Sequence, residues 1–335
     1  MIEPTVYGLS NEQYHRGEEE RLYLSSSQLK WYLKSPRHAK FMLDALTYGD
    51  AKAMKNIKAV LDAVEGKSDA LRFGSLFHDL MACFANKSNY PDAYSDWMRG
   101  VAIFTPPVNE KTLQCFGSTT KVYKEHYEEF LQANAEKIIT SEEELNIAKA
   151  MARSLMYESG ATSEQVRKLL KWGKPEVSHF IEYEGCKFKW RPDLETKRKI
   201  VDWKTVSTDD LSEESLNRII LKYGYHISAP FYQFFTHEQT GVWKDFYIVF
   251  VSKVPPYDSV MVDMAAYGYR YLPDADIVIP GPGAMEFKRL LDLHIKCTKE
   301  NHWPGAENSI PDNGGVRVLE IQPPRYYANR FIEEI

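Results

Sequence analysis

Two stretches near the middle of the chain alternate apolar with polar residues, which is typical of β-strands that bury one face. They are residues 177–181 and 186–190, and the Glu184-Gly185 pair between them predicts a hairpin turn. The apolar runs 200–206 and 243–251 predict two further strands. The expected order is three strands, a helical stretch and a fourth strand.

Apolar residues at helical spacing predict the remaining elements. One helix is expected to begin at Ser25 to Ser27 and to end at Pro36, and Ser141 followed by Glu144 forms a capping box at the start of another. The first ~20 residues hold few apolar positions and predict an extended lead-in, and the proline-containing stretch 85–120 predicts loops. Further helices are expected at 38–45, 71–80, 121–133, 141–157, 163–170, 208–223, 229–237 and 284–300.

The composition is that of a soluble globular protein. Of the 335 residues, 44% are hydrophobic and 27% are charged, which excludes the disordered and fibrous classes. No apolar run reaches the ~18 residues that cross a bilayer, and the N-terminus lacks a signal-peptide pattern, so a cytoplasmic location without a membrane partner is expected. The four cysteines have no metal-site spacing and predict free thiols.

The net charge of −5 argues against DNA binding, because phosphate contacts normally require clustered Lys and Arg. The charges are unevenly placed, however, and a local field can oppose the net charge. The run Lys197 to Lys199 is either a phosphate contact or a solvated hairpin turn. Basic residues gather around the middle strands at Lys187, Lys189, Arg191, Lys197, Arg198 and Lys199.

The triplet Asp202-Trp203-Lys204 places an acid and a lysine on one face of a predicted strand. A second acid, Asp193, lies nine positions upstream, across a polar stretch that suits a hairpin or short loop. Two carboxylates and an ammonium that converge can hold Mg²⁺ and assist phosphodiester hydrolysis. The alternatives are a turn aspartate at Asp193 and a simple ion pair between Asp202 and Lys204.

This pattern resembles the D-(x)n-D/E-x-K motif of the PDDEXK nuclease superfamily, and the wider match is to its RecE-like (exonuclease VIII) branch of phage and prophage recombination nucleases. The resemblance implies an α/β (α+β) protein with a restriction-endonuclease-like core, in which helices flank a mixed central sheet. The expected parts are a mainly helical 1–170, a catalytic core 171–255, and a C-terminal helix with turns, 256–335, on the same domain. The segments that carry the resemblance are 24–30 with Ser35-Pro36, 72–78, 176–178, 190–193, 201–205 and 225–233.

The resemblance also implies roles for individual residues. Lys204 would position or activate the attacking water. His78 follows Gly-Ser-Leu-Phe on a predicted helix and matches the histidine beside the metal in similar nucleases, although a hydrogen-bonded core histidine is the alternative. Glu182 is the alternative to Glu176 as the upstream acid. The implied metal ligands are Asp193, Asp202, Glu176 and His78, and the implied substrate-phosphate contacts are Gln233 and Thr205.

By the same resemblance, the chain is expected to be a Mg²⁺-dependent 5′ to 3′ exonuclease, with Mn²⁺ as a substitute, acting on linear double-stranded DNA ends. It would produce 3′ single strands for recombination in a bacterial or phage-infected cell. A ring-shaped homo-oligomer, trimeric or tetrameric, and a single-strand annealing protein as partner are implied. The alternatives are an endonuclease or single-strand nuclease of the same superfamily, and a DNA-binding module without catalysis.

Overall fold

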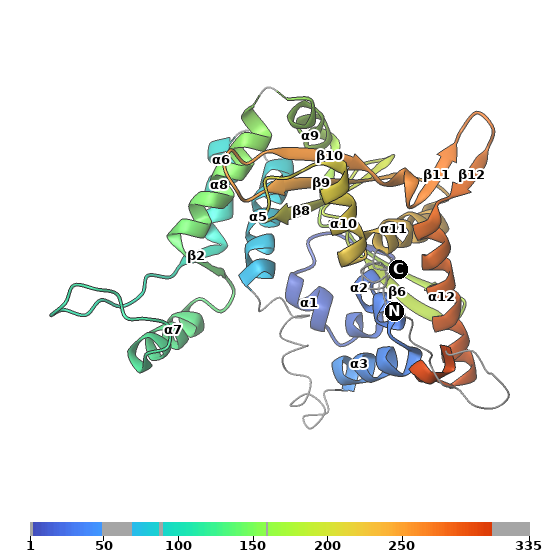
Figure 1. Ribbon diagram of the computed structural model, residues 1–335, viewed down its shortest axis with the longest axis horizontal. Coiled ribbons are helices and arrows are strands. Elements are labelled where there is room, and N and C mark those ends of the chain that lie inside the picture. Colours follow the sequence, from blue (N-terminus) through green and yellow to red (C-terminus); the bar gives the residue numbers. More distant parts are fainter. Residues whose placement is uncertain (1–2, 49–68, 87–89, 159, 310–335) are drawn as a thin grey trace, which may run out of the picture.

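A five-stranded sheet with the order β10-β9-β8-β7-β4 lies at the centre of the protein (Figure 1). The computed structural model describes residues 3–48, 69–86, 90–158 and 160–309. Strands β8 and β9 are parallel and the other neighbours are antiparallel, so the sheet is mixed as predicted. Its strands are β4 (Lys174–Pro175), β7 (Leu194–Glu195), β8 (Lys199–Val206), β9 (Asp245–Ser252) and β10 (Ser259–Asp263).

Side chains alternate between the two faces of β8, and each face packs against helices. Val201 and Trp203 belong to a buried cluster with α5 (Asp69–Asn86), α8 (Glu142–Tyr157) and α9 (Ala161–Trp172). Ile200 and Val206 pack on the other face. Because α5 and β8 share one cluster, the helices before residue 170 and the strands after it form a common core.

Two helices connect the parallel strands β8 and β9. They are α10 (Glu213–Tyr223) and α11 (Tyr225–Thr240), which meet at Gly224 in the left-handed conformation (φ 69°). Helix α10 begins later than the predicted Thr208, because the Ser212 side chain accepts the Ser215 N–H and caps it there. Helix α11 begins four residues before the predicted Ala229.

The predicted hairpin is present as β5 (Ser178–Tyr183) and β6 (Cys186–Trp190). Glu184 and Gly185 both have positive φ, as a tight two-residue hairpin turn requires. The hairpin belongs to a separate three-stranded sheet with β1 (Thr5–Val6) rather than to the central one. Pro192 follows β6 and has no N–H for a ladder, which accounts for the break before β7.

Two regions differ from the expectation. The supposed lead-in contains helix α1 (Asn11–Arg16), whose first turn is capped when the Ser10 hydroxyl accepts the Gln13 N–H. The region 85–120, predicted to be loops, contains helix α6 (Tyr90–Arg99), in which Pro91 stands in the first turn, where a missing N–H costs nothing. Trp97 fastens α6 to α5 by donating its indole N–H to the Leu76 carbonyl.

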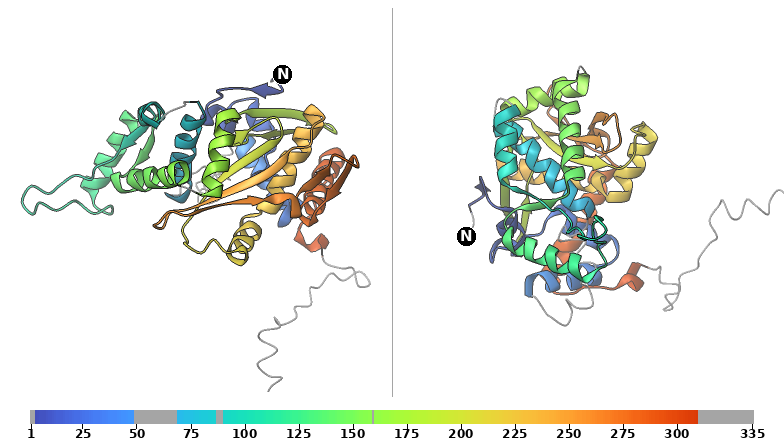
Figure 2. Two further views of the ribbon diagram at one scale, coloured as in Figure 1. Left: turned by 90° about the horizontal axis from the view of Figure 1, so that it is seen from above. Right: turned by 90° about the vertical axis from the view of Figure 1, so that its left-hand side faces the viewer.

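The other elements lie around this framework. Helix α7 (Lys121–Ala133) and the loop before it reach away from the sheet, and the hairpin of β11 (Tyr269–Leu272) and β12 (Ile277–Pro280) projects at the opposite end (Figures 1 and 2). In the described ranges, no helix is long and apolar enough to cross a membrane. The rest are η1 (Glu20–Leu22), α2 (Ser26–Leu29), η2 (Lys30–Leu33), α3 (Pro36–Tyr48), β2 (Val101–Ile103), β3 (Ile138–Thr140), η3 (Met264–Ala266), α12 (Pro282–Glu300) and η4 (Ala306–Ser309). The end of the chain, 310–335, lies outside the described residues.

Candidate active site

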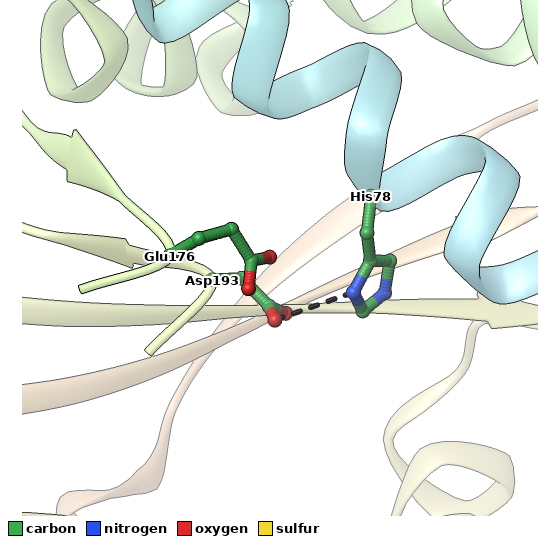
Figure 3. Close-up of side chains that lie close together, drawn as sticks. All are labelled: His78, Glu176 and Asp193. Carbon is green, nitrogen blue, oxygen red and sulfur yellow. Dashed lines mark ion pairs between the residues drawn. The ribbon is translucent and has the colours of Figure 1, made fainter. Parts of the chain in front are cut away.

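Three side chains from distant parts of the sequence meet beside the central sheet (Figure 3). His78 comes from α5, Glu176 lies between β4 and β5, and Asp193 immediately precedes β7. One ligand atom from each lies within 4.8 Å of the others. His78 Nδ1 is 3.2 Å from Asp193 Oδ1. The structure thus brings together three of the four predicted metal ligands.

Asp193 is held in place by the backbone of β8. Its Oδ2 accepts a 2.6 Å hydrogen bond from the Trp203 backbone N–H. The antiparallel register pairs Leu194 with Val201, so continuing it by one residue sets Asp193 opposite Asp202. The predicted hairpin between the two acids is therefore correct, and it is what brings them together.

Asp202 and Lys204 share the β8 face predicted for them and form an ion pair of 2.5 Å. Both are largely buried, with 15% and 22% of their side chains exposed. The Lys204 ammonium also lies 5.4 Å from the centre of the Tyr225 ring. Asp202 is thus bound to Lys204 and stands next to the group of His78, Glu176 and Asp193 rather than within it.

The charges of the site are strongly coupled. Burial and the neighbouring Asp193 raise the pKa of Glu176 to about 8. Burial also raises the pKa of Asp202 to about 6, with Lys204 opposing and Asp193 adding to the shift. Burial alone would raise the pKa of Asp193, but the charge and the hydrogen bond of His78 outweigh burial and lower this pKa to about 2. The raised pKa values of Glu176 and Asp202 mean that a further cation would favour the ionised form of both acids.

This donor set fits a divalent cation. Carboxylate oxygens are the ligands that Mg²⁺ and Mn²⁺ prefer, and an imidazole also suits transition metals. A cation would relieve the repulsion that raises the pKa of Glu176. The Glu176 side chain is 32% exposed, so solvent and substrate can reach the group. His78, Glu176 and Asp193 would hold the ion, with Asp202 beside them.

The two predicted phosphate contacts are placed elsewhere. Gln233 is 1% exposed, and its amide is used by the backbone: Nε2 donates to the carbonyls of Lys244 and Tyr269, and Oε1 accepts the Tyr269 N–H. It ties α11 to β11 and has no amide group left for a phosphate. Thr205 lies on the β8 face opposite Lys204, by the strand's alternation. Glu182, the alternative acid, is paired with Lys187 across the hairpin, outside the group that contains Glu176.

Tyr232, the neighbour of Gln233, also lies beside the site, on the same helix as Tyr225. Its hydroxyl donates to the Arg191 carbonyl at 3.3 Å. Burial raises its pKa well above the ordinary value, and the charges of Asp202, Asp193 and Glu176 add to this. The sequence offers only a weak signal for choosing it, because Tyr232, Phe234 and Phe235 make this part of the helix apolar on several sides.

Five of the six basic residues around the middle strands fall into two groups, and the sixth, Lys187, is exposed on β6. Lys189 and Arg191 are buried under the N-terminal segment, where the Lys189 ammonium donates to the carbonyls of Tyr14 and Glu20. Thr196 accepts the N–H groups of Arg198 and Lys199 through its hydroxyl, which forms the turn between β7 and β8. The hairpin-turn interpretation of Lys197 to Lys199 therefore describes the structure.

The chain belongs to the family described as "PDDEXK-like domain of unknown function (DUF3799)", whose model matches residues 25–309. The fold and the superfamily expected from the sequence are thereby confirmed. A search of curated proteins found no match. Among solved structures, a "Putative exonuclease" from Eubacterium rectale aligns with a TM-score of 0.48 and 15% identity, over 97% of this chain and 98% of that one. At that level of similarity it supports no argument about the site.

Proposed function

We propose that this protein is a Mg²⁺-dependent deoxyribonuclease of the RecE-like type, a 5′ to 3′ exonuclease on linear double-stranded DNA. The observation that carries the proposal is the meeting of His78, Glu176 and Asp193 within 4.8 Å, next to the Asp202–Lys204 pair. Membership of a PDDEXK-like family supports a nuclease. The polarity and the duplex preference rest on the resemblance of the sequence motifs.

The reaction would be attack of water on a backbone phosphorus, with loss of the 3′ oxygen and formation of a 5′ phosphate and a 3′ hydroxyl. A bound Mg²⁺ would supply Lewis-acid stabilisation of the charge that develops on the phosphate. Asp202 raises the pKa of Lys204, although burial acts against it. Lys204 therefore stays an ammonium that donates to the water or to a phosphate oxygen, and it does not act as the base.

An exposed aromatic and basic surface supports nucleic acid as the substrate. Trp172 is 75% exposed, whereas the other six tryptophans of the chain are buried or half-buried. The Lys171 ammonium lies 5.2 Å from its ring centre, and Lys174 lies 4.8 Å from the ring centre of Tyr7, which is 62% exposed. We name Tyr7, Lys171, Trp172 and Lys174 the aromatic-basic patch. Lys174 is two positions from Glu176, so a DNA strand bound at the aromatic-basic patch would lie next to the site.

Linear duplex DNA labelled at its 5′ or its 3′ ends provides the test. With Mg²⁺, we expect rapid release of 5′-labelled mononucleotide, while the 3′ label stays in strands that shorten progressively from their 5′ ends and become single-stranded. With EDTA there should be no cleavage. Covalently closed circular duplex is the control and should remain intact. Preferential release from the 3′ ends, or full activity in EDTA, would contradict the proposal.

The same assay separates the rival functions. Nicking or linearisation of the closed circle would indicate an endonuclease, and degradation of single strands alone would indicate a single-strand nuclease. DNA binding without cleavage in any divalent metal would indicate an inactive binding module. We further propose a ring-shaped trimer or tetramer that works with a single-strand annealing protein. Light scattering after size exclusion would test the ring, because a monomeric mass would exclude a ring of three or four subunits.

A further inference from the structure

Arg191 lies between the N-terminal helix α1 and the candidate metal site. Its Nη1 donates to Asn11 Oδ1 at 2.8 Å, and its guanidinium stacks on the Tyr14 ring at 3.9 Å. Its Nε donates to the Ser178 hydroxyl at 2.8 Å. Nη1 also faces Glu176 Oε2 at 3.9 Å, which is an ion pair without a hydrogen bond. Arg191 is 8% exposed, so these contacts fix it on several sides.

Glu176 depends on such support more than an ordinary ligand does. Its φ of 52° is unfavourable for a residue with a side chain. Its carboxylate shares a small space with Asp193, which repels it, and the attractive charges acting on it are His78 and Arg191. The His78 ring is already at hydrogen-bonding distance from Asp193. Arg191 is therefore the cation placed to attract the Glu176 carboxylate.

We propose that Arg191 is a positioning residue that holds Glu176 in the metal-binding geometry, and that helix α1 sets the position of Arg191 through Asn11 and Tyr14. Helix α1 lies before residue 25, where the match to the family model begins. The N-terminal segment of this protein would then complete a site whose ligands all lie within the family domain. The inference rests on the proposed function only in taking the site to bind a divalent metal.

A purely structural role is the competing explanation, because Arg191 could serve only to attach α1 to the hairpin. The two roles differ in what they do to the metal site. A structural anchor would affect unfolding but leave the metal affinity of the folded protein unchanged. A positioning residue would change metal affinity through Glu176, and its effect would disappear once Glu176 had lost its charge.

The experiment measures Mn²⁺ binding by titration calorimetry on the full-length chain, together with the melting temperature. Arg191→Met should weaken Mn²⁺ binding about 10- to 100-fold. Asn11→Ala, which leaves Arg191 in place but frees one side of it, should give a smaller loss in the same direction. Lys187→Met is the matched control: Lys187 is an exposed cation on β6 that lies on the Tyr23 ring, and its loss should leave Mn²⁺ affinity unchanged.

The pair of variants Glu176→Gln and Arg191→Met/Glu176→Gln decides between the explanations. We expect the double variant to bind Mn²⁺ no more weakly than Glu176→Gln alone. Equal losses from Arg191→Met in both backgrounds would overturn the inference, as would unchanged affinity in Arg191→Met. If Arg191→Met does not fold, Asn11→Ala takes its place in the same cycle, and unchanged affinity in that variant overturns the inference.

The inference and the proposed function can fail separately. A wild-type protein that binds Mn²⁺ with the expected dependence on Arg191 but cleaves no DNA would refute the nuclease and keep the positioning role. A protein that cleaves DNA with Mg²⁺ while the Asn11 and Arg191 variants retain full metal affinity would keep the nuclease and refute the positioning role. A wild-type protein without any Mn²⁺ binding refutes the inference as well.

Discussion

Asp193 and Trp203 are joined by a 2.6 Å hydrogen bond in which one carboxylate oxygen of Asp193 accepts the Trp203 N–H, while the other oxygen faces His78. Asp193 therefore has two functions that a single substitution would confuse. It satisfies a buried backbone donor, and in the proposed function it also supplies a charge to the metal group. An Asn side chain keeps an oxygen acceptor but loses the charge, whereas an Ala side chain loses both.

We expect Asp193→Asn to abolish cleavage with little change in the free energy of unfolding. Asp193→Ala should abolish cleavage and also lower that free energy by about 1–3 kcal/mol, because the Trp203 N–H is left unsatisfied. Urea unfolding and single-turnover cleavage on the same preparations check both values. Substantial cleavage by Asp193→Asn would remove Asp193 from the metal site.

Lys204→Met should reduce single-turnover cleavage at least ~100-fold, because the ammonium that acts on water or phosphate is removed. Asp202 then loses its buried ion-pair partner, but its pKa is already raised to about 6, so it can take up a proton and limit the loss of stability. Lys199→Met is a control on the same strand, since Lys199 begins β8 and its ammonium lies over the Tyr247 ring on β9. Near wild-type cleavage by Lys204→Met would show that the pair is only structural.

His78→Ala tests whether helix α5 belongs to the site. We expect a loss of turnover of about 100-fold with a small change in melting temperature, because in the proposed function His78 contacts Asp193 and the metal rather than the core. The matched control is His226→Ala, which removes a histidine paired with Glu286 at 3.1 Å outside the metal group. A large melting shift with preserved turnover would make His78 a core residue.

Residues whose partners are near in sequence or on adjacent strands could be predicted from the sequence. The Asp202–Lys204 face follows from strand alternation, and the Asp193 hairpin follows from a polar stretch between two apolar runs. Gln233 could not be placed correctly, because α11 begins four residues earlier than its pattern suggests and its aromatic residues leave the helix rotation undefined. Helix α1 is too short to show an apolar stripe, and Ser10 with Gln13 was its one capping signal.

Acidification should lower the free energy of unfolding, and part of this loss should come from His294, a residue that lies away from the metal site. His294 is buried, and its Nδ1 is within hydrogen-bonding distance of the Tyr32 hydroxyl, at 2.6 Å. Burial lowers its pKa from 6.5 to about 4. The unfolded chain therefore binds the extra proton first, so stability is full above pH 6.5 and is lost as the pH falls toward 4.

The loss from this one group amounts to about 3 kcal/mol at most. His294→Gln keeps an acceptor for Tyr32 but does not titrate, so the difference in unfolding free energy between the two proteins should shrink as the pH falls from 6.5 to 4. Urea denaturation at several pH values measures this difference. A difference that stays constant with pH would show that His294 is not the group responsible.

Binding to DNA should depend on the aromatic-basic patch more than on other surface cations. Trp172→Ala should weaken binding of a partly single-stranded duplex about tenfold, because a stacked base contributes about 1–3 kcal/mol. The measurement uses the cleavage-deficient Asp193→Asn background, so that binding is read without degradation. Quenching of the exposed indole on binding, absent in the Trp172 variant, would give an independent signal.

The lysines of the patch should act through phosphate. Lys171→Met and Lys174→Met should each weaken binding and lower the dependence of affinity on salt by about one unit of slope. Lys168→Met is the control for Lys171→Met on the same helix. The Lys168 ammonium is already paired with Glu164 at 2.6 Å, so the substitution leaves Glu164 unpaired instead of removing a free cation. If Lys171→Met, Lys174→Met and Trp172→Ala all bind DNA as the parent does, the substrate does not pass over this surface, and the path of the DNA to Glu176 and Asp193 lies on another side of the site.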